Sequence, residues 1–172
     1  KNTNIIIFDP FKQLNLSTSI YKNYCTENID RMLNSTIDYI KELKESQEQT
    51  EGIILIFGIN KFISKLQDQN QLTNLAQQLK EYEKISLVIV DDVSKIKSYT
   101  FETWFTTLFN VNDGIWIGRG IADQNLLHLS TINKEMTKNY KNDMGYIISE
   151  GVGTLCKMID YTSEDEEESN GK

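Results

Sequence analysis

The chain has 172 residues, of which 39% are hydrophobic and 25% charged, the composition of a globular domain large enough to bury a core. No apolar run approaches the ~20 residues that a membrane-spanning helix needs. The net charge is −7, of which residues 164–172 carry −4, and a mildly acidic body with two arginines argues against nucleic-acid binding.

The first half of the chain predicts an α/β fold with a parallel sheet. Consecutive apolar residues at 5–8, 53–57 and 87–90 are typical of strands that are buried on both faces. Apolar residues recur at helical spacing in the two stretches between these strands, at 29–44 and 72–82, and Thr26 is the expected N-cap of the first. Strands that alternate with helices in this way are joined by right-handed crossovers.

The second half is predicted to be less regular. In chain order it holds a short aromatic helix capped by Ser98 or Thr100, a strand, two further helices and a closing hairpin, at residues 101–109, 114–118, 123–129, 133–140 and 145–159. We expect one domain over residues 1–161 and a disordered acidic tail at 162–172.

Asp91 and Asp92 close the 87–90 strand, at the end where open α/β sheets bind their ligands. A Walker B strand would hold Mg²⁺ with such an acid, but the sequence lacks the Gly-x-x-x-x-Gly-Lys-Ser/Thr phosphate loop. A receiver domain also pairs acids after a strand, but the 80 residues that follow Asp92 are too few for its remaining elements. In the third alternative the two acids are structural, either solvated or capping the next turn. The residues alone leave these roles open.

Two other features could contact a partner. Arg119 lies between two glycines directly after a strand, so it is either an anion contact or arginine finger, or the surface charge of a tight turn. The residues of the aromatic helix are expected in the core, although their density could also leave an apolar stripe for a partner. They are Trp104, Phe105, Leu108 and Phe109.

Neither a catalytic triad nor a zinc site nor a disulfide is predicted. His128, the single histidine, lies between leucines and is interpreted as structural. Cys25 and Cys156 are far apart in sequence and are expected to be reduced thiols.

Residues 114–160 resemble a known family. Gly-Ile-Trp-Ile-Gly-Arg-Gly-Ile-Ala-Asp-Gln at 114–124 is followed by Leu-His-Leu-Ser and, from Asp143, by Asp-Met-Gly-Tyr-Ile-Ile-Ser-Glu-Gly. These segments resemble the C-terminal ATPase domain of the type VII secretion coupling proteins, type VIIb in particular, within the FtsK/SpoIIIE superfamily of P-loop motors. The resemblance extends over residues 1–161, and the 114–124 motif is its specific part.

The resemblance implies a three-layer, P-loop NTPase-like (RecA-like or FtsK-like) fold, with a largely parallel sheet flanked by helices and a C-terminal hairpin. Ile-Phe-Asp-Pro at 7–10 is similar to the strand that follows the P-loop helix, which implies that the chain starts after the Walker A position. The Walker B acids would follow the next strand, where Phe57 and Gly58 stand instead. The resemblance therefore implies a degenerate ATPase domain.

For function, the resemblance implies a substrate-recognition module of a membrane-anchored bacterial secretion motor, on the cytoplasmic side of the plasma membrane and connected with virulence. The implied partners are secreted helical substrate proteins, the neighbouring ATPase domains of the same chain, and further copies in a hexamer. No catalytic residue, metal or cofactor is expected in this segment, and ATP with Mg²⁺ would bind elsewhere in the parent protein. The alternatives are a working ATPase whose P-loop lies upstream and a DNA motor, against which the acidic body argues.

The candidate site residues form three groups. A nucleotide or interdomain contact is predicted for Asp91, Asp92, Arg119, Asp123 and Gln124. Phe57 and Gly58 mark the degenerate Walker B position, and substrate docking is predicted for the four residues of the aromatic helix named above.

Overall fold

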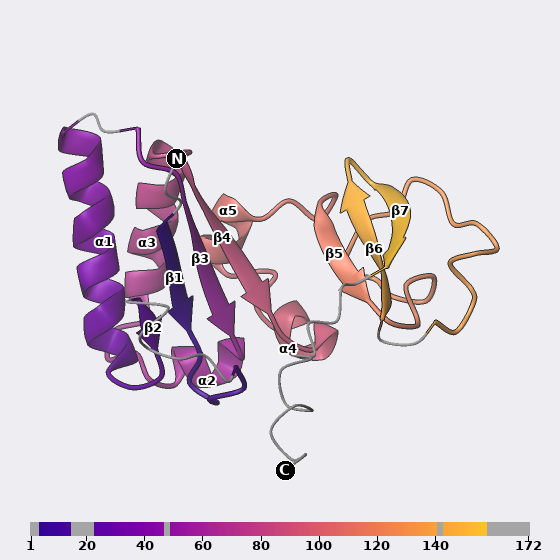
Figure 1. The fold of residues 1–172 in the computed structure, drawn as a ribbon, viewed down its shortest axis with the longest axis horizontal. Helices are drawn as coiled ribbons and strands as arrows, with labels where there is room; N and C mark the ends of the chain where they lie inside the picture. The colour runs from indigo at the N-terminus through magenta and orange to yellow at the C-terminus, as the bar shows by residue number, and fades with distance from the viewer. Residues whose placement is uncertain (1–3, 15–22, 47–48, 141–142, 158–172) are drawn as a thin grey trace, which may run out of the picture. The chain divides into compact units, whose positions relative to one another are not determined.

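The computed structural model describes residues 4–14, 23–46, 49–140 and 143–157. They form two compact units, Lys1–Phe109 and Asn110–Lys172 (Figure 1), each with its own sheet and its own core. The sequence predicts one domain over 1–161, and the described part of this range divides into two units after Phe109. The predicted acidic tail at 162–172 lies outside the described residues. Among the described helices, none combines the length and the apolarity needed to span a bilayer.

The first unit contains a four-stranded parallel sheet in the order β2-β1-β3-β4. Its strands are β1 (Asn4–Phe8), β2 (Tyr24–Cys25), β3 (Gly52–Phe57) and β4 (Ile85–Val90). The predicted parallel α/β sheet is therefore confirmed for this unit. β2 is not predicted, because a strand of two residues is too short to show a periodic pattern.

The described residues of the same unit form five helices: α1 (Ile29–Glu45), α2 (Ile59–Ile63), α3 (Asn70–Glu81), α4 (Val93–Lys97) and α5 (Thr103–Leu108). The long amphipathic helices lie where the periodicity predicts them. The N-caps of α1 and α5 differ from the predicted ones. The N-cap of α1 is Asn28, which has a left-handed backbone (φ 53°) and no side-chain cap hydrogen bond, so the predicted cap at Thr26 is wrong. The N-cap of α5 is Glu102, so the predicted cap at Ser98 or Thr100 is wrong.

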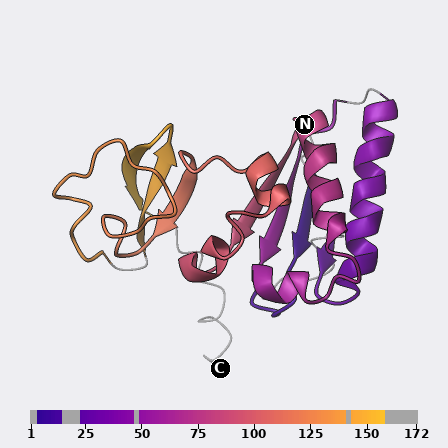
Figure 2. The same cartoon turned by 180° about the vertical axis from the view of Figure 1, so that it is seen from behind.

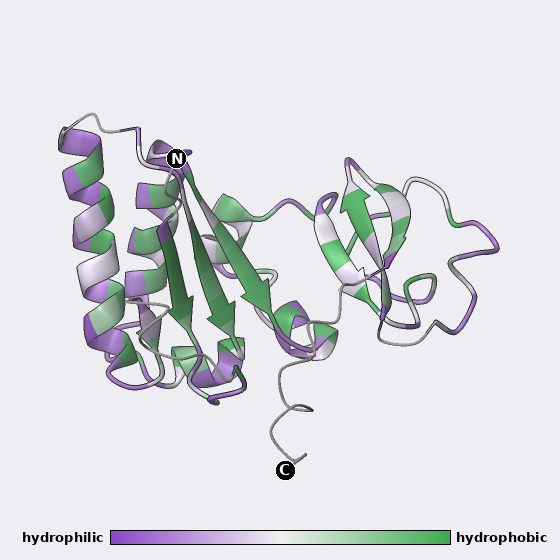
Figure 3. Ribbon diagram, viewed as in Figure 1, coloured by the Kyte–Doolittle hydropathy of each residue, from purple (hydrophilic) through white to green (hydrophobic). Residues whose placement is uncertain are grey.

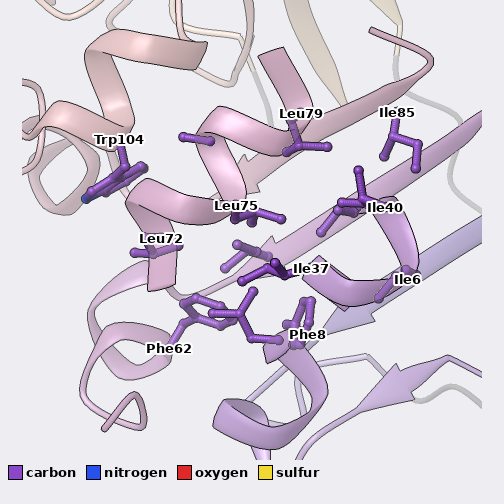
Figure 4. Close-up of a cluster of buried hydrophobic side chains, with 14 of the residues drawn as sticks. Ile6, Phe8, Ile37, Ile40, Phe62, Leu72, Leu75, Leu79, Ile85 and Trp104 are labelled. Carbon is purple, nitrogen blue, oxygen red and sulfur yellow. The ribbon is translucent and has the colours of Figure 1, made fainter. Parts of the chain in front are cut away.

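One face of the sheet carries the core of this unit (Figure 4). Ile6, Phe8, Ile54 and Ile56 point to that face, and α1, α2, α3 and α5 all add buried side chains to the same cluster. Figures 1 and 2 show α1 and α3 beside each other along the sheet. The described helices therefore give two layers, where the resemblance implies three.

The opposite face is only partly covered by the described residues. The alternate residues of β3 are half-buried, and on β4 Val88 and Val90 are 37% and 41% exposed. The prediction that the 87–90 strand is buried on both faces is thus wrong, because β4 is an edge strand whose second face has no described helix above it.

The second unit is a three-stranded antiparallel sheet in the order β5-β6-β7, made of β5 (Gly114–Ile117), β6 (Met144–Ser149) and β7 (Val152–Lys157). The predicted strand and closing hairpin are confirmed. Its core contains Ile121, Met136, Tyr146 and Ile148.

The helices predicted at 123–129 and 133–140 are absent, and both stretches run as turns and loops. The reason is local hydrogen bonding by side chains, which competes with helical hydrogen bonds. The Gln124 side chain bonds the backbone of residues 126 and 127, and Asn133 Oδ1 accepts from the amides of Glu135 and Met136.

Candidate functional site at the carboxyl edge of the parallel sheet

The carboxyl ends of β1, β3 and β4 meet at one edge of the sheet, because the strands are parallel and in register. Asp9 follows β1, Gly58 follows β3 and Asp91 follows β4. The chain leaves β1 for β2 on one side and leaves β3 for β4 on the other, so a topological switch point lies between β1 and β3. Open α/β sheets bind ligands at such an edge, which makes it the first place to look for chemistry.

The Asp91 carboxylate is buried, with 5% of its side chain exposed, and both of its oxygens have partners. Oδ2 accepts a hydrogen bond of 2.9 Å from the backbone amide of Ile59, the first residue of α2. Oδ1 accepts from the amide of Asp92 at 2.8 Å and from Lys95 Nζ at 3.1 Å. Asp91 therefore connects the ends of β3 and β4, which is the structural alternative that the sequence leaves open.

The Asp92 side chain is 75% exposed and forms an ion pair of 3.1 Å with Lys95. Lys95 thus bridges both acids. Its hydrogen bonds to Asp91 and then to Asp92 raise the pKa of the ammonium group. The ammonium group of Lys95 lies 3.1 Å from one oxygen of each carboxylate.

Asp9 is fully buried at the other side of the switch point. Its Oδ2 accepts from the amide of Leu14 at 2.8 Å and from the Tyr24 hydroxyl at 2.9 Å, whereas Oδ1 has no hydrogen-bond partner among the described residues. Burial, and next the hydrogen bond to Asp9, raise the pKa of Tyr24. Asp9 is not among the predicted site residues, although its position directly after an apolar strand indicates the carboxyl edge of the sheet.

Phe57 and Gly58, the predicted position of degenerate Walker B acids, end β3 and follow it, and neither has a side-chain oxygen. Gly58 has a left-handed backbone (φ 72°), and its amide donates to the Val90 carbonyl at 3.1 Å. A Cβ at Gly58 would lie 2.4 Å from the Phe11 ring, and Lys61 Nζ lies 4.5 Å from the centroid of that ring. An aromatic ring with a lysine above it therefore covers the end of β3.

These residues do not fit a Mg²⁺–nucleotide. Within the described ranges no three His, Cys, Asp or Glu side chains are grouped closely enough to hold a metal ion. The one buried acid at the end of β4 already uses both oxygens for backbone amides and Lys95.

The other predicted nucleotide or interdomain contacts lie in the second unit. Arg119 is exposed in a turn between Gly118 (φ 81°) and Gly120 (φ 87°), and its carbonyl accepts from Trp116 Nε1 at 3.1 Å. Asp123 is exposed, and its amide donates to the Gly120 carbonyl. These two side chains stay predicted contacts.

Gln124 is engaged with its own loop. Its Oε1 accepts from the amides of Leu126 and Leu127, and its Nε2 donates to the Leu127 carbonyl, each at 2.7 Å. Both lone pairs of the side-chain oxygen are thus used, which gives Gln124 a structural task in addition to any predicted contact.

The predicted docking residues lie on or next to α5. Trp104 and Phe105 are buried in the core, with their rings 5.6 Å apart in an edge-to-face arrangement. Leu108 and Phe109 are half-buried against the same cluster. The burial favours the core interpretation for the first pair, and a docking role stays a prediction for the second pair.

Two shallow hollows complete the description. One, of about 350 Å³, lies at the end of β2 and the start of α1 and is lined by Tyr24, Cys25 and Arg31 among others. The second, of about 440 Å³, lies in the second unit and is lined mainly by apolar side chains around His128. Apart from Gln124, neither hollow contains a predicted site residue.

The fold and this edge define an α/β protein with an open, parallel sheet and a separate antiparallel sheet. A scan of the sequence against family models gives no match, and a search of the curated proteins gives none. The structure is similar to the solved cytoplasmic domain of EssC, with a TM-score of 0.60 and 10% sequence identity over 90% of this chain and 33% of that chain. At this identity the likeness shows the fold alone. The chain spans about a third of the length of that structure.

Proposed function

We propose that this chain is the C-terminal ATPase-like module of a type VII secretion motor, where it recognises secreted helical proteins and couples them to neighbouring ATPase domains. The observation that carries the proposal is the fold likeness to the cytoplasmic domain of EssC across nine-tenths of the chain. EssC is the type VIIb coupling protein to which the sequence resemblance also points, and the motif at 114–124 supports the assignment to its last domain. The proposal places the module on the cytoplasmic side of a membrane-anchored protein.

The carboxyl edge favours recognition over hydrolysis. Phosphoryl transfer needs an acid that positions Mg²⁺ beside the β- and γ-phosphates. At this edge Phe57 and Gly58 replace the expected acids, and Asp91 is held by Ile59, Asp92 and Lys95. A module that has lost metal positioning can still bind proteins and transmit binding to its neighbours.

Phe101 is the side chain that we assign to substrate contact beside α5. It is 96% exposed, directly before the helix that carries the buried Trp104 and Phe105. Exposed aromatic side chains are frequent anchors in protein interfaces. Phe101 therefore presents an apolar group whose removal does not disturb the core.

The test is a calorimetric titration of the chain, without nucleotide, with a small helical protein secreted by the same system. We expect saturable binding, at least about tenfold weaker for Phe101→Ala, as for an interface anchor. Thr106→Ala, an exposed polar position on the same helix, is the matched control and should leave the affinity unchanged. Absence of binding by the wild-type chain would contradict the proposed function.

A further inference from the structure

Residues 98–102 join the short helix α4 to α5, and they include Phe101. The chain after β4 alternates between hydrophilic and hydrophobic residues, whereas β4 itself is mostly hydrophobic (Figure 3). Tyr99 and Thr100 are half-buried, but the next side chain, Phe101, is 96% exposed. A large apolar side chain in water is unfavourable, so the position of Phe101 must be enforced by the chain around it.

Phe101 lies at the tip of a β-turn formed by residues 99–102. A hydrogen bond of 2.9 Å from the Glu102 amide to the Tyr99 carbonyl closes this turn. Neither central residue, Thr100 or Phe101, has a positive φ, so the turn carries no left-handed strain. The chain reverses at this point, which keeps the Phe101 side chain out of the core.

Both ends of the turn are held by local hydrogen bonds. Before the tip, the Thr100 hydroxyl donates to the Lys97 carbonyl at 3.0 Å. After it, Glu102 is the N-cap of α5, and its carbonyl accepts from the amide of Thr106 at 3.0 Å. These bonds fix the turn to the two short helices beside it, and a further contact attaches it to the core.

Tyr99 makes that further contact. Its half-buried ring packs against the core cluster of the first unit, and its centroid lies 5.9 Å from that of the Trp104 ring. Aromatic rings whose centroids are about 4.5–7 Å apart attract each other. Trp104 is itself buried and packs edge-to-face against Phe105. Tyr99 therefore joins the exposed tip of the turn to a buried helix.

We propose that Tyr99 is a positioning residue, whose ring fixes the backbone of Phe101 before a protein partner binds. This role rests on the proposed function, in which Phe101 contacts a secreted helical protein. A residue that is already ordered loses little conformational entropy on binding, so Tyr99 strengthens the contact without touching the partner. The partner that this turn fits is a protein surface with an apolar pocket for one phenyl ring.

The first test measures the order of the Phe101 amide in the full chain by ¹⁵N relaxation, without any partner. We expect an order parameter of about 0.85 in the wild type, as for rigid backbone, and one below about 0.6 in Tyr99→Ala. Tyr99→Phe keeps the ring and should restore the wild-type value. Tyr39→Ala removes another half-buried tyrosine from the same core, so it is the matched control and should leave Phe101 ordered.

A Phe101 amide that is mobile in the wild type, or equally ordered with and without the Tyr99 ring, would overturn the proposal. This readout does not depend on the identity of the partner. It also separates positioning from general loss of stability, because Tyr39→Ala removes a similar ring far from the turn in sequence.

The second test is a double-mutant cycle for binding of the secreted helical protein, measured by calorimetry. Tyr99→Ala should weaken binding about tenfold, since ordering the backbone of one residue costs roughly this factor, and Tyr99→Phe should not. In a Phe101→Ala background Tyr99→Ala should have no further effect, because no anchor is left to position.

Equal losses from Tyr99→Ala in both backgrounds would show that Tyr99 does not act through Phe101, and would also overturn the proposal. A wild-type chain that fails to bind contradicts the proposed function instead. In that case the relaxation measurement still decides whether Tyr99 orders Phe101.

Discussion

Asp91, at the end of β4, accepts a hydrogen bond of 2.9 Å from the backbone amide of Ile59, at the start of α2. The two residues are 32 positions apart. Their contact joins the chain after β3 to the end of β4 and occupies one of the two carboxylate oxygens of Asp91. The acid that marks this edge as a candidate active site therefore has a structural task as well.

Replacing Asp91 by Ala should destabilise the first unit by about 2–3 kcal/mol, because a buried backbone amide and Lys95 lose a charged partner. Urea unfolding at neutral pH measures the change. Asp92→Ala is the matched control, since an exposed ion pair contributes about 0.5 kcal/mol. Equal losses for the two variants would mean that the Asp91–Ile59 contact is unimportant.

Replacing Gly58 by Ala should cost about 1–3 kcal/mol, because the residue has φ 72° and a Cβ would collide with the Phe11 ring. A double-mutant cycle separates the two causes. In a Phe11→Ala background the collision disappears and only the backbone strain should remain, so the cost of Gly58→Ala falls. An unchanged cost in that background would show that Phe11 does not close the end of β3.

Trp104→Ala should cost about 3–5 kcal/mol, the usual loss for a large aromatic side chain in a core. Phe101→Ala, three residues away but exposed, should change the free energy of unfolding by less than about 0.5 kcal/mol. Thermal or urea unfolding of the two variants gives the comparison. If Trp104→Ala kept full stability and lost only substrate binding, α5 would be a docking surface instead of core.

The Tyr140 hydroxyl, in the second unit, should titrate far above an ordinary tyrosine. Its hydrogen bond of 2.6 Å to Glu135, and next its burial, raise the pKa of Tyr140 to about 12. Because the folded pKa is the higher one, this contribution to stability is complete below about pH 10 and is lost as the pH rises towards about 12. Ultraviolet titration of tyrosinate, with Tyr140→Phe to identify the signal, measures the shift.

Glu135→Gln offers the matched variant for that titration. It removes the negative acceptor, so the pKa of Tyr140 should fall towards its ordinary value. The hydrogen bonds from Lys138 and then from Tyr140 also lower the pKa of Glu135 in the wild type. A Tyr140 that titrates at the same pH with and without Glu135 would contradict this assignment.

Most of the first unit could be predicted because its pattern is strong. Apolar runs and 3.6-residue periodicity place three strands and both long helices, and their alternation implies parallel pairing. A local pattern does not show which faces of a strand the rest of the protein covers. The apolar run of β4 is typical of a strand buried on both sides, yet its position at the edge leaves Val88 and Val90 exposed.

The candidate site was predictable in position but not in role. Acids after a buried strand indicate the carboxyl edge of the sheet, and Asp91 lies there. Its partner Ile59 is remote in sequence, so its structural task appears only in three dimensions. The helices predicted at 123–129 and 133–140 are absent for the opposite reason: Gln124 and Asn133 form short-range side-chain hydrogen bonds that the apolar spacing does not reveal.

The most direct test of the central claim, that the module recognises protein without hydrolysing nucleotide, is a calorimetric titration of the chain with ATP–Mg²⁺ combined with a phosphate-release assay. We expect neither binding heat nor turnover, because no acid stands at the predicted Walker B position, Phe57 and Gly58, and Asp91 is occupied by backbone amides and Lys95. Saturable nucleotide binding with turnover that Asp91→Asn abolishes would contradict it, and would make this edge an active site.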